Sequence, residues 1–434
     1  MRSLPIVLAL VAFHPARADE TAPPPAAGEK PLDEREPPYA NGDSSWLDGG
    51  NRQPGSLLQW GPLTGSVFVD AYYAFQFSQP ADHTIFQTTT APRHNEIALN
   101  LIALGLEVSG LNGPIGRLYL QAGSNVETDW GQDASTQRGQ FLTVRALAPI
   151  QQAAVGWHFH ALHGINAEVG IFPSYFSMES YLPQENWNYT HPFVSDFTPY
   201  YFAGTRTQLF LRQNLKLELW LVNGWQSFGQ WHETRAGGYQ LNFRPTGRIS
   251  INHSAYAGKD EPADPHAVRL YADQFIQWQW LKGGPVKSAA LALVADLGFE
   301  HRSRGSSGWM TGGSLSNRVE LDERWAACAR ADLFYDQTQA VVIQLPLGSP
   351  YTLPDKGAFL AGGLAFTLDF APSPWLLLRL EYARRWANLP YFSGPRGITG
   401  PGGVAPADPA VAASFTPDLR KSDDRVVANA TLRL

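Results

Sequence analysis

Apolar and polar residues alternate along most of the chain with a period of two. In residues 63–78 an apolar series runs through the odd positions, while polar side chains such as Asp70 and Gln76 fall between them. The same alternation appears in residues 215–221, 376–382 and 426–434. Because successive side chains of a strand point to opposite faces, this pattern predicts β-strands with one apolar and one polar face. One break in register, at Leu101 and Ile102, predicts a β-bulge.

The connections between the predicted strands alternate in length. Seven short and eight long connections separate sixteen predicted strands, so both chain ends lie on the side of the short connections. Most strands have the roughly 9 to 11 residues that a tilted strand needs to cross a bilayer. Outer-membrane barrels combine an even number of strands with short turns at one end and long loops at the other. The sequence therefore predicts an all-β fold: a transmembrane antiparallel up-and-down β-barrel of about 16 strands, in the range of roughly 14 to 18.

The apolar strand faces also favour a barrel in a membrane over a soluble fold. Lipid offers no hydrogen-bond partner to an open sheet edge, so a sheet in a bilayer must close on itself. Aromatic residues near predicted strand ends, such as Trp278, Trp280 and Tyr382, fit the girdles at the two membrane interfaces. A soluble β-protein would have to cover leucine and phenylalanine side chains on nearly every strand.

The N-terminus has the features of an export signal. Arg2 provides a positive start, residues 4–13 form a short apolar core, and residues 16–18 read Ala-Arg-Ala, a small-x-small cleavage pattern. We therefore expect residues 1–18 to be a signal peptide. Residues 19–56 are rich in proline and alanine and lack apolar periodicity, which predicts an extended periplasmic segment. The outer-membrane barrel is then expected over residues 57–434.

Composition excludes several other classes of protein. The 14 Trp, 16 Tyr and 23 Phe, with only 17% charged residues, exclude disorder for most of the chain. No apolar run approaches the roughly 18 to 20 residues of a membrane-spanning helix. The net charge of -6 and the absence of a basic block argue against nucleic acid as a partner. Cys328 is the only cysteine, so the chain has no intramolecular disulfide and no cysteine-rich metal site.

Candidate catalytic and metal-binding residues are few. His158 and His160 share one strand face, but no third metal ligand accompanies them. The glycine-rich residues 394–403 have no Lys-Ser/Thr pair, so they do not predict a phosphate-binding loop. His253 and Ser254 are adjacent on a strand and point to opposite faces, so they cannot form a catalytic pair. We expect no enzymatic activity, no catalytic residues, no metal and no cofactor.

Several segments resemble the OmpL-like family of β-barrel porins from Gram-negative bacteria. These segments are Phe172-Pro173, Glu179-Ser180, residues 186–190 (Asn-Trp-Asn-Tyr-Thr), residues 199–204, residues 222–225 and residues 378–382. The resemblance implies an outer-membrane porin and brings no catalytic residues. Two positions depart from the family pattern: Thr190 stands where serine is expected, and the chain ends in Leu434 where barrels usually have an aromatic residue.

The inward positions of the predicted strands carry charged residues. A lipid-facing charge costs about 2 to 4 kcal/mol at mid-depth, so these positions require a wet lumen or a partner. The predicted pore-lining residues are Asp70, Arg206, Gln208, Glu218, Asp296, Arg330, Asp332, Arg379 and Glu381. The third long connection, residues 174–199, is rich in aromatic residues, and we expect it to fold inward and constrict the pore. Its predicted constriction residues are Glu179, Asn186, Trp187, Asn188 and Tyr189.

These features together predict a diffusion channel. The expected partners are outer-membrane lipids and small hydrophilic solutes that diffuse passively through the lumen. By analogy with other barrels of this size, a further partner is a second copy of the chain in a homo-oligomer. Three of the charged candidates are basic and six are acidic, Glu179 included, which predicts a weak preference for cations. Two alternatives are an outer-membrane barrel whose loops have an enzymatic or adhesive function, and a secreted soluble carbohydrate-active β-protein.

Overall fold

The computed structural model describes residues 39, 46–47, 56–86, 88–109, 113–130, 133, 144–261, 264–342, 357–404 and 408–434. The predicted signal peptide and most of the segment 19–56 lie outside the described residues. The chain divides into two units, residues 1–36 and residues 37–434, and the second unit contains the barrel.

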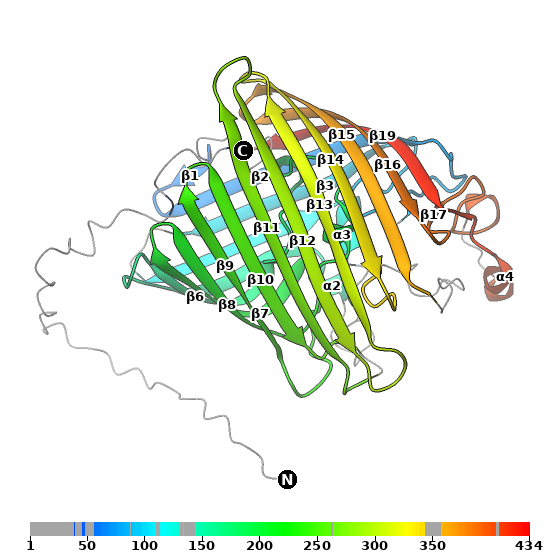
Figure 1. Cartoon of the computed structure of the whole chain (residues 1–434), viewed down its shortest axis with the longest axis horizontal. Helices are drawn as coiled ribbons and strands as arrows, with labels where there is room; N and C mark the ends of the chain where they lie inside the picture. The colour runs from blue at the N-terminus through cyan, green and yellow to red at the C-terminus, as the bar shows by residue number, and fades with distance from the viewer. Residues whose placement is uncertain are drawn as a thin grey trace, which may run out of the picture. The chain divides into compact units, whose positions relative to one another are not determined.

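Sixteen antiparallel strands of the described residues form a closed barrel (Figure 1). Strands that follow one another in the chain are neighbours in the sheet, and β19 pairs with β2 to close it. A two-residue strand, β1 (Gln59–Trp60), also pairs with the start of β2. The sixteen are β2 Leu63–Gln76, β3 Ile97–Val108, β4 Pro114–Ala122, β5 Ile150–Phe159, β6 Ile165–Pro173, β7 Tyr201–Arg212, β8 Leu215–Val222, β9 Ala236–Thr246, β10 Ile249–Gly258, β11 Val268–Lys282, β12 Ser288–His301, β13 Gly308–Glu320, β14 Trp325–Asp336, β15 Phe359–Ser373, β16 Leu376–Ala387 and β19 Ser422–Arg433.

Long and short connections alternate between these strands, as the sequence predicts. The seven short connections lie at one rim, which we call the short-turn rim, and the eight long ones lie at the other, the long-loop rim. The long connections contain the remaining elements: α1 Ser124–Trp130, α2 Val144–Leu147, η3 Pro183–Glu185, α3 Phe193–Asp196, η4 Pro401–Gly403, α4 Pro409–Ser414, and the pair β17 Phe392–Ser393 and β18 Leu419–Arg420. In the described part of the chain, no helix has both the length and the apolar character to cross a bilayer.

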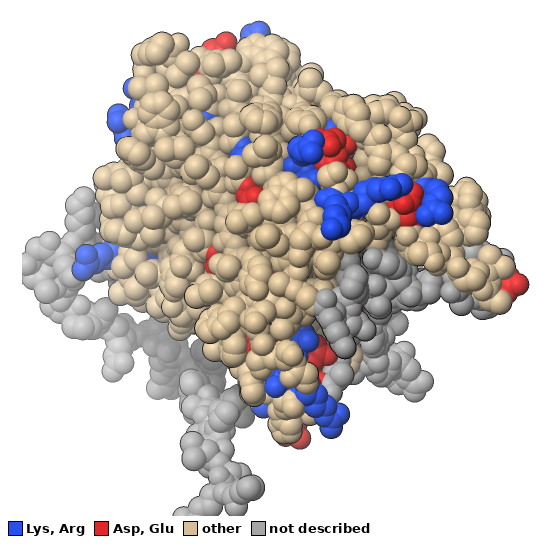
Figure 2. Space-filling model, turned by 45° about the vertical axis from the view of Figure 1, so that its right-hand side comes forward, with Lys and Arg blue, Asp and Glu red and all other residues tan. Residues whose placement is uncertain are grey.

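Side-chain burial follows the predicted alternation, with the apolar faces outward. Along β14 every second residue is buried, and the outward positions between include Leu333, which is 52% exposed. Leu293 and Leu297 of β12 are exposed to a similar degree. Most of the surface in Figure 2 is therefore uncharged, with Lys, Arg, Asp and Glu confined to a few clusters. This is the surface expected for a barrel in contact with lipid.

The predicted β-bulge lies in β3. Asp70 pairs with Leu101 and Ala71 pairs with Leu99, which leaves Asn100 without a partner in the ladder. The extra residue turns the Asn100 side chain inward, where its Nδ2 donates a hydrogen bond of 2.9 Å to Asp70. The bulge thus contributes a hydrogen-bond donor to the lumen.

The interior of the barrel holds the packed core. Toward the long-loop rim, aromatic residues from strands and loops form one buried cluster, which includes Phe172, Phe193, Phe202, Phe334, Phe359, Tyr391 and Phe392. Loop segments therefore occupy much of the space that the strands enclose. In the predicted linker, Tyr39, Trp46 and Leu47 also contact the barrel, so these residues are docked and not part of a free extended segment.

The lipid-facing surface allows a direct test of barrel orientation. Leu315→Arg, at an outward position midway along β13, should lower the free energy of unfolding in lipid vesicles by about 2 to 4 kcal/mol. Leu321→Arg is the matched control, because Leu321 is 47% exposed in a short turn, close to the 52% of Leu315. Equal effects of the two substitutions in urea titrations would contradict the membrane placement.

Candidate functional site

The long connection between β6 and β7, residues 174–200, folds into the barrel, and we call it L3. Its aromatic side chains are buried, with Trp187, Tyr189 and Phe193 each at most 2% exposed. Helix α3 of L3 packs against β13, β14 and β15 (Figure 1). An aromatic-rich loop of this kind gains more from burial than from exposure to water, which explains its inward path.

Glu381 of β16 is one anchor of L3. Its carboxylate accepts hydrogen bonds from the Tyr189 N–H at 2.6 Å, the Thr190 N–H at 3.1 Å and the Thr190 hydroxyl at 2.5 Å. The Thr367 hydroxyl of β15 donates a fourth bond at 2.7 Å. Glu381 is fully buried, so these bonds replace its hydration and fix the tip of L3 to the wall.

Five buried arginines of β13, β14, β16 and β19 surround this anchor, and we call them the arginine wall. Arg379 donates to the carbonyls of Pro183 at 2.6 Å and Asn186 at 2.5 Å. Arg385 donates to Asp196 of α3 at 2.7 Å. The members are Arg318, Arg330, Arg379, Arg385 and Arg425, and buried carboxylates nearby are Asp196, Asp332, Asp369, Glu381 and Asp423. The positive charge of the wall is therefore matched by carboxylates and used to hold L3.

The structure divides the predicted pore-lining residues into two groups. Five of them contact L3 directly: Asp70, Arg330, Asp332, Arg379 and Glu381. The other four bond to neighbouring strands: Arg206, Gln208, Glu218 and Asp296. Of the predicted constriction residues, Asn186, Trp187, Asn188 and Tyr189 face the arginine wall and its neighbours, and Glu179 lines a cavity on L3.

Several buried charged residues near L3 were not predicted from the sequence, and two of them, Arg318 and Arg385, contact L3. Arg318, Asp369, Arg385, Asp423 and Arg425 all lie inside the barrel, in ion pairs at 2.7 to 3.5 Å. The period-two pattern could have found all five, because each is in phase with inward residues of its own strand: Arg385 with Glu381, Asp369 with Thr367, Arg318 with Ser316, and Asp423 and Arg425 with Asn429. The contacts of Arg318 and Arg385 with L3 had no sequence signal.

The opposite wall, from β4 to β8, carries a polar network that L3 does not cover. His158 Nδ1 lies 2.7 Å from Asn166 Oδ1, and Asn166 Nδ2 donates to Gln208 at 3.1 Å. Gln208 in turn donates to Glu218 at 2.7 Å, and Lys216 pairs with the same carboxylate at 2.6 Å. All of these except Glu218 keep partial exposure, so this wall can meet water near the short-turn rim.

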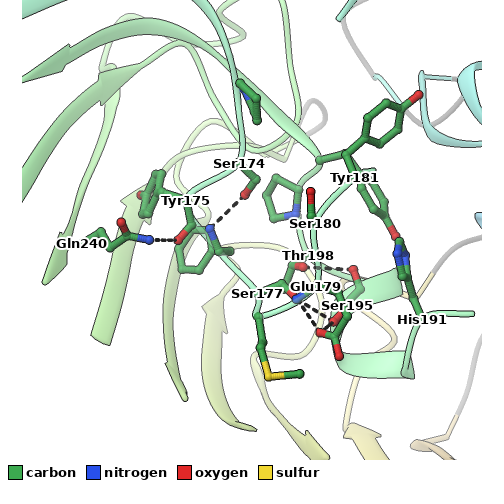
Figure 3. A pocket seen from close by; sticks show the side chains of 15 residues that line it. Ser174, Tyr175, Ser177, Glu179, Ser180, Tyr181, His191, Ser195, Thr198 and Gln240 are labelled. Atoms are coloured by element: carbon green, nitrogen blue, oxygen red, sulfur yellow. Dashed lines mark hydrogen bonds between the residues drawn. The ribbon is translucent and has the colours of Figure 1, made fainter. Parts of the chain in front are cut away.

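A cavity of about 230 Å³ lies between the two limbs of L3 and the side chain of Gln240 (Figure 3). Glu179 points into it, and its Oε2 accepts bonds from the Ser177 hydroxyl at 2.9 Å and the Ser195 hydroxyl at 2.5 Å. The rings of Tyr175 and Tyr181 complete its lining. The cavity therefore offers one carboxylate, several hydroxyls and aromatic faces to a solute.

A second cavity, of about 160 Å³, lies toward the long-loop rim. It is formed by several long connections and L3, and its polar lining includes Thr89, Thr128, Asp196, Gln226 and Arg269. Thr198 and Tyr200 line both cavities. The two cavities therefore adjoin at these two side chains, which makes this the candidate constriction of a path past L3.

Burial sets the protonation of two groups beside the cavities. Burial lowers the pKa of His191, and the neighbouring Asp196 only partly opposes this, so the ring is neutral near pH 7. Its Nδ1 lies 3.1 Å from the Thr89 hydroxyl. Burial, and then the charge of Asp196, raise the pKa of Asp129 well above its usual value. His191 therefore adds no charge to the cavity that it lines.

The histidines considered as candidates for chemistry have structural partners. The rings of His158 and His160 are 5.0 Å apart, and within the described ranges no three His, Cys, Asp or Glu side chains gather as a metal site. His253 lies 2.9 Å from the Tyr239 hydroxyl, whereas Ser254 points inward and donates to the Tyr175 carbonyl at 3.1 Å. The two residues point to opposite faces, as predicted.

Comparison with known proteins places this barrel in a family. Residues 62–401, well over half of the chain, match the family described as putative beta-barrel porin-2, OmpL-like. The chain belongs to this family. The resemblance found in short segments is thus confirmed, and this porin family locates the chain in the bacterial outer membrane. The soluble alternative is excluded by the same match and by the closed transmembrane barrel.

Solved structures of outer-membrane channels share the fold of this porin-family chain. An anion-selective porin from Comamonas acidovorans has a TM-score of 0.53 and 9% identity, over 86% of this chain and 99% of that one. OprB of Pseudomonas putida has a TM-score of 0.52 and 10% identity, over 86% and 94%. The outer-membrane channel DcaP of Acinetobacter baumannii has a TM-score of 0.50 and 9% identity, over 88% and 100%. At these identities the likeness concerns the fold alone. No curated protein matches the sequence.

Proposed function

We propose that the chain is a porin through which small hydrophilic solutes diffuse passively. The observation that carries this proposal is the pair of polar cavities inside the closed barrel, which adjoin at Thr198 and Tyr200. The path enters at the long-loop rim, passes Thr198, crosses the cavity of Glu179 and continues along the polar network of β5 to β8. Hydroxyl and amide groups along it can replace part of the hydration of a solute.

The fixed charges on this path support a weak preference for cations. The arginine wall is covered by L3 and matched by carboxylates, so its field in the path is small. Glu179 presents a carboxylate in the larger cavity. Cations are therefore attracted more than anions.

The same proposal includes the surroundings of the barrel. Residues 1–18 act as the export signal, and outer-membrane lipids contact the band of outward leucine and aromatic side chains. Association into a homo-oligomer follows from fold analogy. No catalytic group takes part in the transport of a solute.

A substitution that fills the candidate constriction tests the proposed path. Thr198→Trp should reduce the swelling rate of proteoliposomes in small sugars by about five-fold or more, because an indole fills the junction of the two cavities. Thr205→Trp is the control, since Thr205 lies near the same end of β7 and faces outward. Swelling that is equal in Thr198→Trp and wild type would show that solutes take another route.

A further inference from the structure

Tyr39, which precedes the barrel strands, is held at the short-turn rim. Its N–H donates to the Gln213 carbonyl at 2.8 Å, in the turn between β7 and β8. Its hydroxyl donates to the Asn242 carbonyl of β9 at 3.2 Å. The Arg244 guanidinium lies 4.3 Å from the centre of its ring. These contacts come from the β7–β8 turn and from β9, and they fix the ring against the barrel mouth.

Trp46 and Leu47 lie inside the barrel, beneath L3. Trp46 is 5% exposed and shares a buried cluster with Ala290, Ala292, Cys328 and Trp187 of L3. Its Nε1 donates to the Gly247 carbonyl at 3.0 Å. The Leu47 carbonyl accepts bonds from Trp187 Nε1 at 3.1 Å and from Gln277 Nε2 at 3.3 Å. The segment is thus bonded both to the barrel wall and to L3.

The wall is shaped to receive these indole rings. Ala290 and Ala292 occupy inward positions of β12, and Cys328 occupies an inward position of β14. Small residues here leave space for Trp46 and Trp187 side by side. Both indole N–H groups have acceptors, which a buried tryptophan requires. The site therefore has both the shape and the hydrogen-bond acceptors of a binding site for Trp46.

The described residues of this segment contact the barrel at widely separated points of its circumference. Tyr39 bonds to β9 and the β7–β8 turn, whereas Trp46 and Leu47 contact β11, β12 and β14. The Ser56 hydroxyl donates to the Gly65 carbonyl of β2 at 2.6 Å, and β2 lies across the barrel from β9 and β10. The segment therefore reaches from one side of the short-turn rim to the other.

We infer that Trp46 and Leu47 form a plug that enters the pore from the periplasmic side and narrows its exit beneath L3 from the side of β10 to β14, across from the polar network of β5 to β8. This inference rests on the proposed function. The plug is held by packing and hydrogen bonds only, so it can leave without breaking a covalent bond. Its departure would uncover Gln277, a polar side chain that can be hydrated, and would widen the exit.

Conductance in planar bilayers tests the plug. Trp46→Ala should raise the single-channel conductance about two-fold or more over wild type, because the exit is no longer filled. Trp46→Phe, which keeps a ring but loses the N–H donor, should fall between the two. Trp60→Ala is the matched control, since Trp60 belongs to the same N-terminal region but is 61% exposed on β1. It should conduct like wild type.

Labelling of Cys328 gives a second readout that does not depend on ion flow. Cys328 is the only cysteine and is 4% exposed beneath Trp46, so a small water-soluble thiol reagent should modify it slowly in wild type and at least about ten-fold faster in Trp46→Ala. If wild type conducts and Trp46→Ala changes neither conductance nor labelling, the proposal of a plug is wrong, while the proposal that the chain is a porin is unaffected. If no variant conducts, the proposed function itself is wrong, even where labelling shows that Trp46 covers the site.

Discussion

Glu381→Ala should loosen L3, raising single-channel conductance about two-fold or more with added current noise. The carboxylate accepts four hydrogen bonds, three of them from Tyr189 and Thr190 of L3. Alanine leaves these buried donors without an acceptor, at about 1 to 3 kcal/mol for each one that stays unpaired. It also removes a negative charge that interacts with Arg425 of the arginine wall. The barrel should therefore unfold at lower urea concentration as well.

Two further variants separate the loop anchor from general damage to the barrel. Glu381→Gln keeps the shape and one acceptor oxygen, so its conductance should lie between those of wild type and Glu381→Ala. Glu323→Ala removes a carboxylate that is 81% exposed in a short turn, and it should change neither conductance nor stability. A Glu381→Ala barrel that is destabilised but conducts like wild type would mean that L3 does not limit the path.

Glu179→Lys should turn a weak cation preference into an anion preference, measured as a change of sign in the reversal potential under a salt gradient. The substitution changes the local charge by two units, inside the larger of the two cavities. Low-dielectric walls strengthen the field of a fixed charge in such a space. The effect should shrink at high salt, because the screening length falls to about 3 Å near 1 M.

The matched control for this charge reversal lies outside the path. Glu127→Lys makes the same change at an exposed position of α1 and should leave the reversal potential as in wild type. Equal shifts in the two variants would indicate a surface effect on the whole protein. An unchanged reversal potential in Glu179→Lys would exclude Glu179 from the conducting path.

The strands of this barrel could be predicted from the sequence because their signal is local. A residue such as Leu333 faces lipid and its neighbour Asp332 faces inward, so the period of two is visible in one segment. The bulge at Asn100 was predictable for the same reason, since one extra residue shifts the apolar positions. Even the inward path of L3 had a signal, in aromatic residues too numerous for a solvated loop.

The contacts of L3 could not be predicted, because they join residues far apart in the chain. Arg379 bonds to Pro183 across 196 positions, and Glu381 bonds to Tyr189 across 192. The alternation predicts that Arg379 and Glu381 face inward, but both a water-lined pore and a buried anchor satisfy that pattern. Whether Arg379 and Glu381 line a pore or anchor a loop depends on the position of L3, and L3 has no periodic pattern that predicts its position.

The contacts of the docked N-terminal residues were even harder to predict from the sequence. Residues 19–56 have the composition of a linker, and Trp46 and Leu47 stand alone among polar and glycine residues with no apolar periodicity. Its partners, Ala290, Ala292 and Cys328, come from strands more than two hundred residues away. Burial of Trp46 therefore depends on closure of the barrel and leaves no local pattern.

Planar-bilayer recording of the purified, refolded chain tests most directly whether a wet path crosses this barrel. We expect discrete conductance steps, small in wild type and larger in both Trp46→Ala and Glu381→Ala. Folded, membrane-inserted protein that gives no steps in any of the three would contradict this expectation.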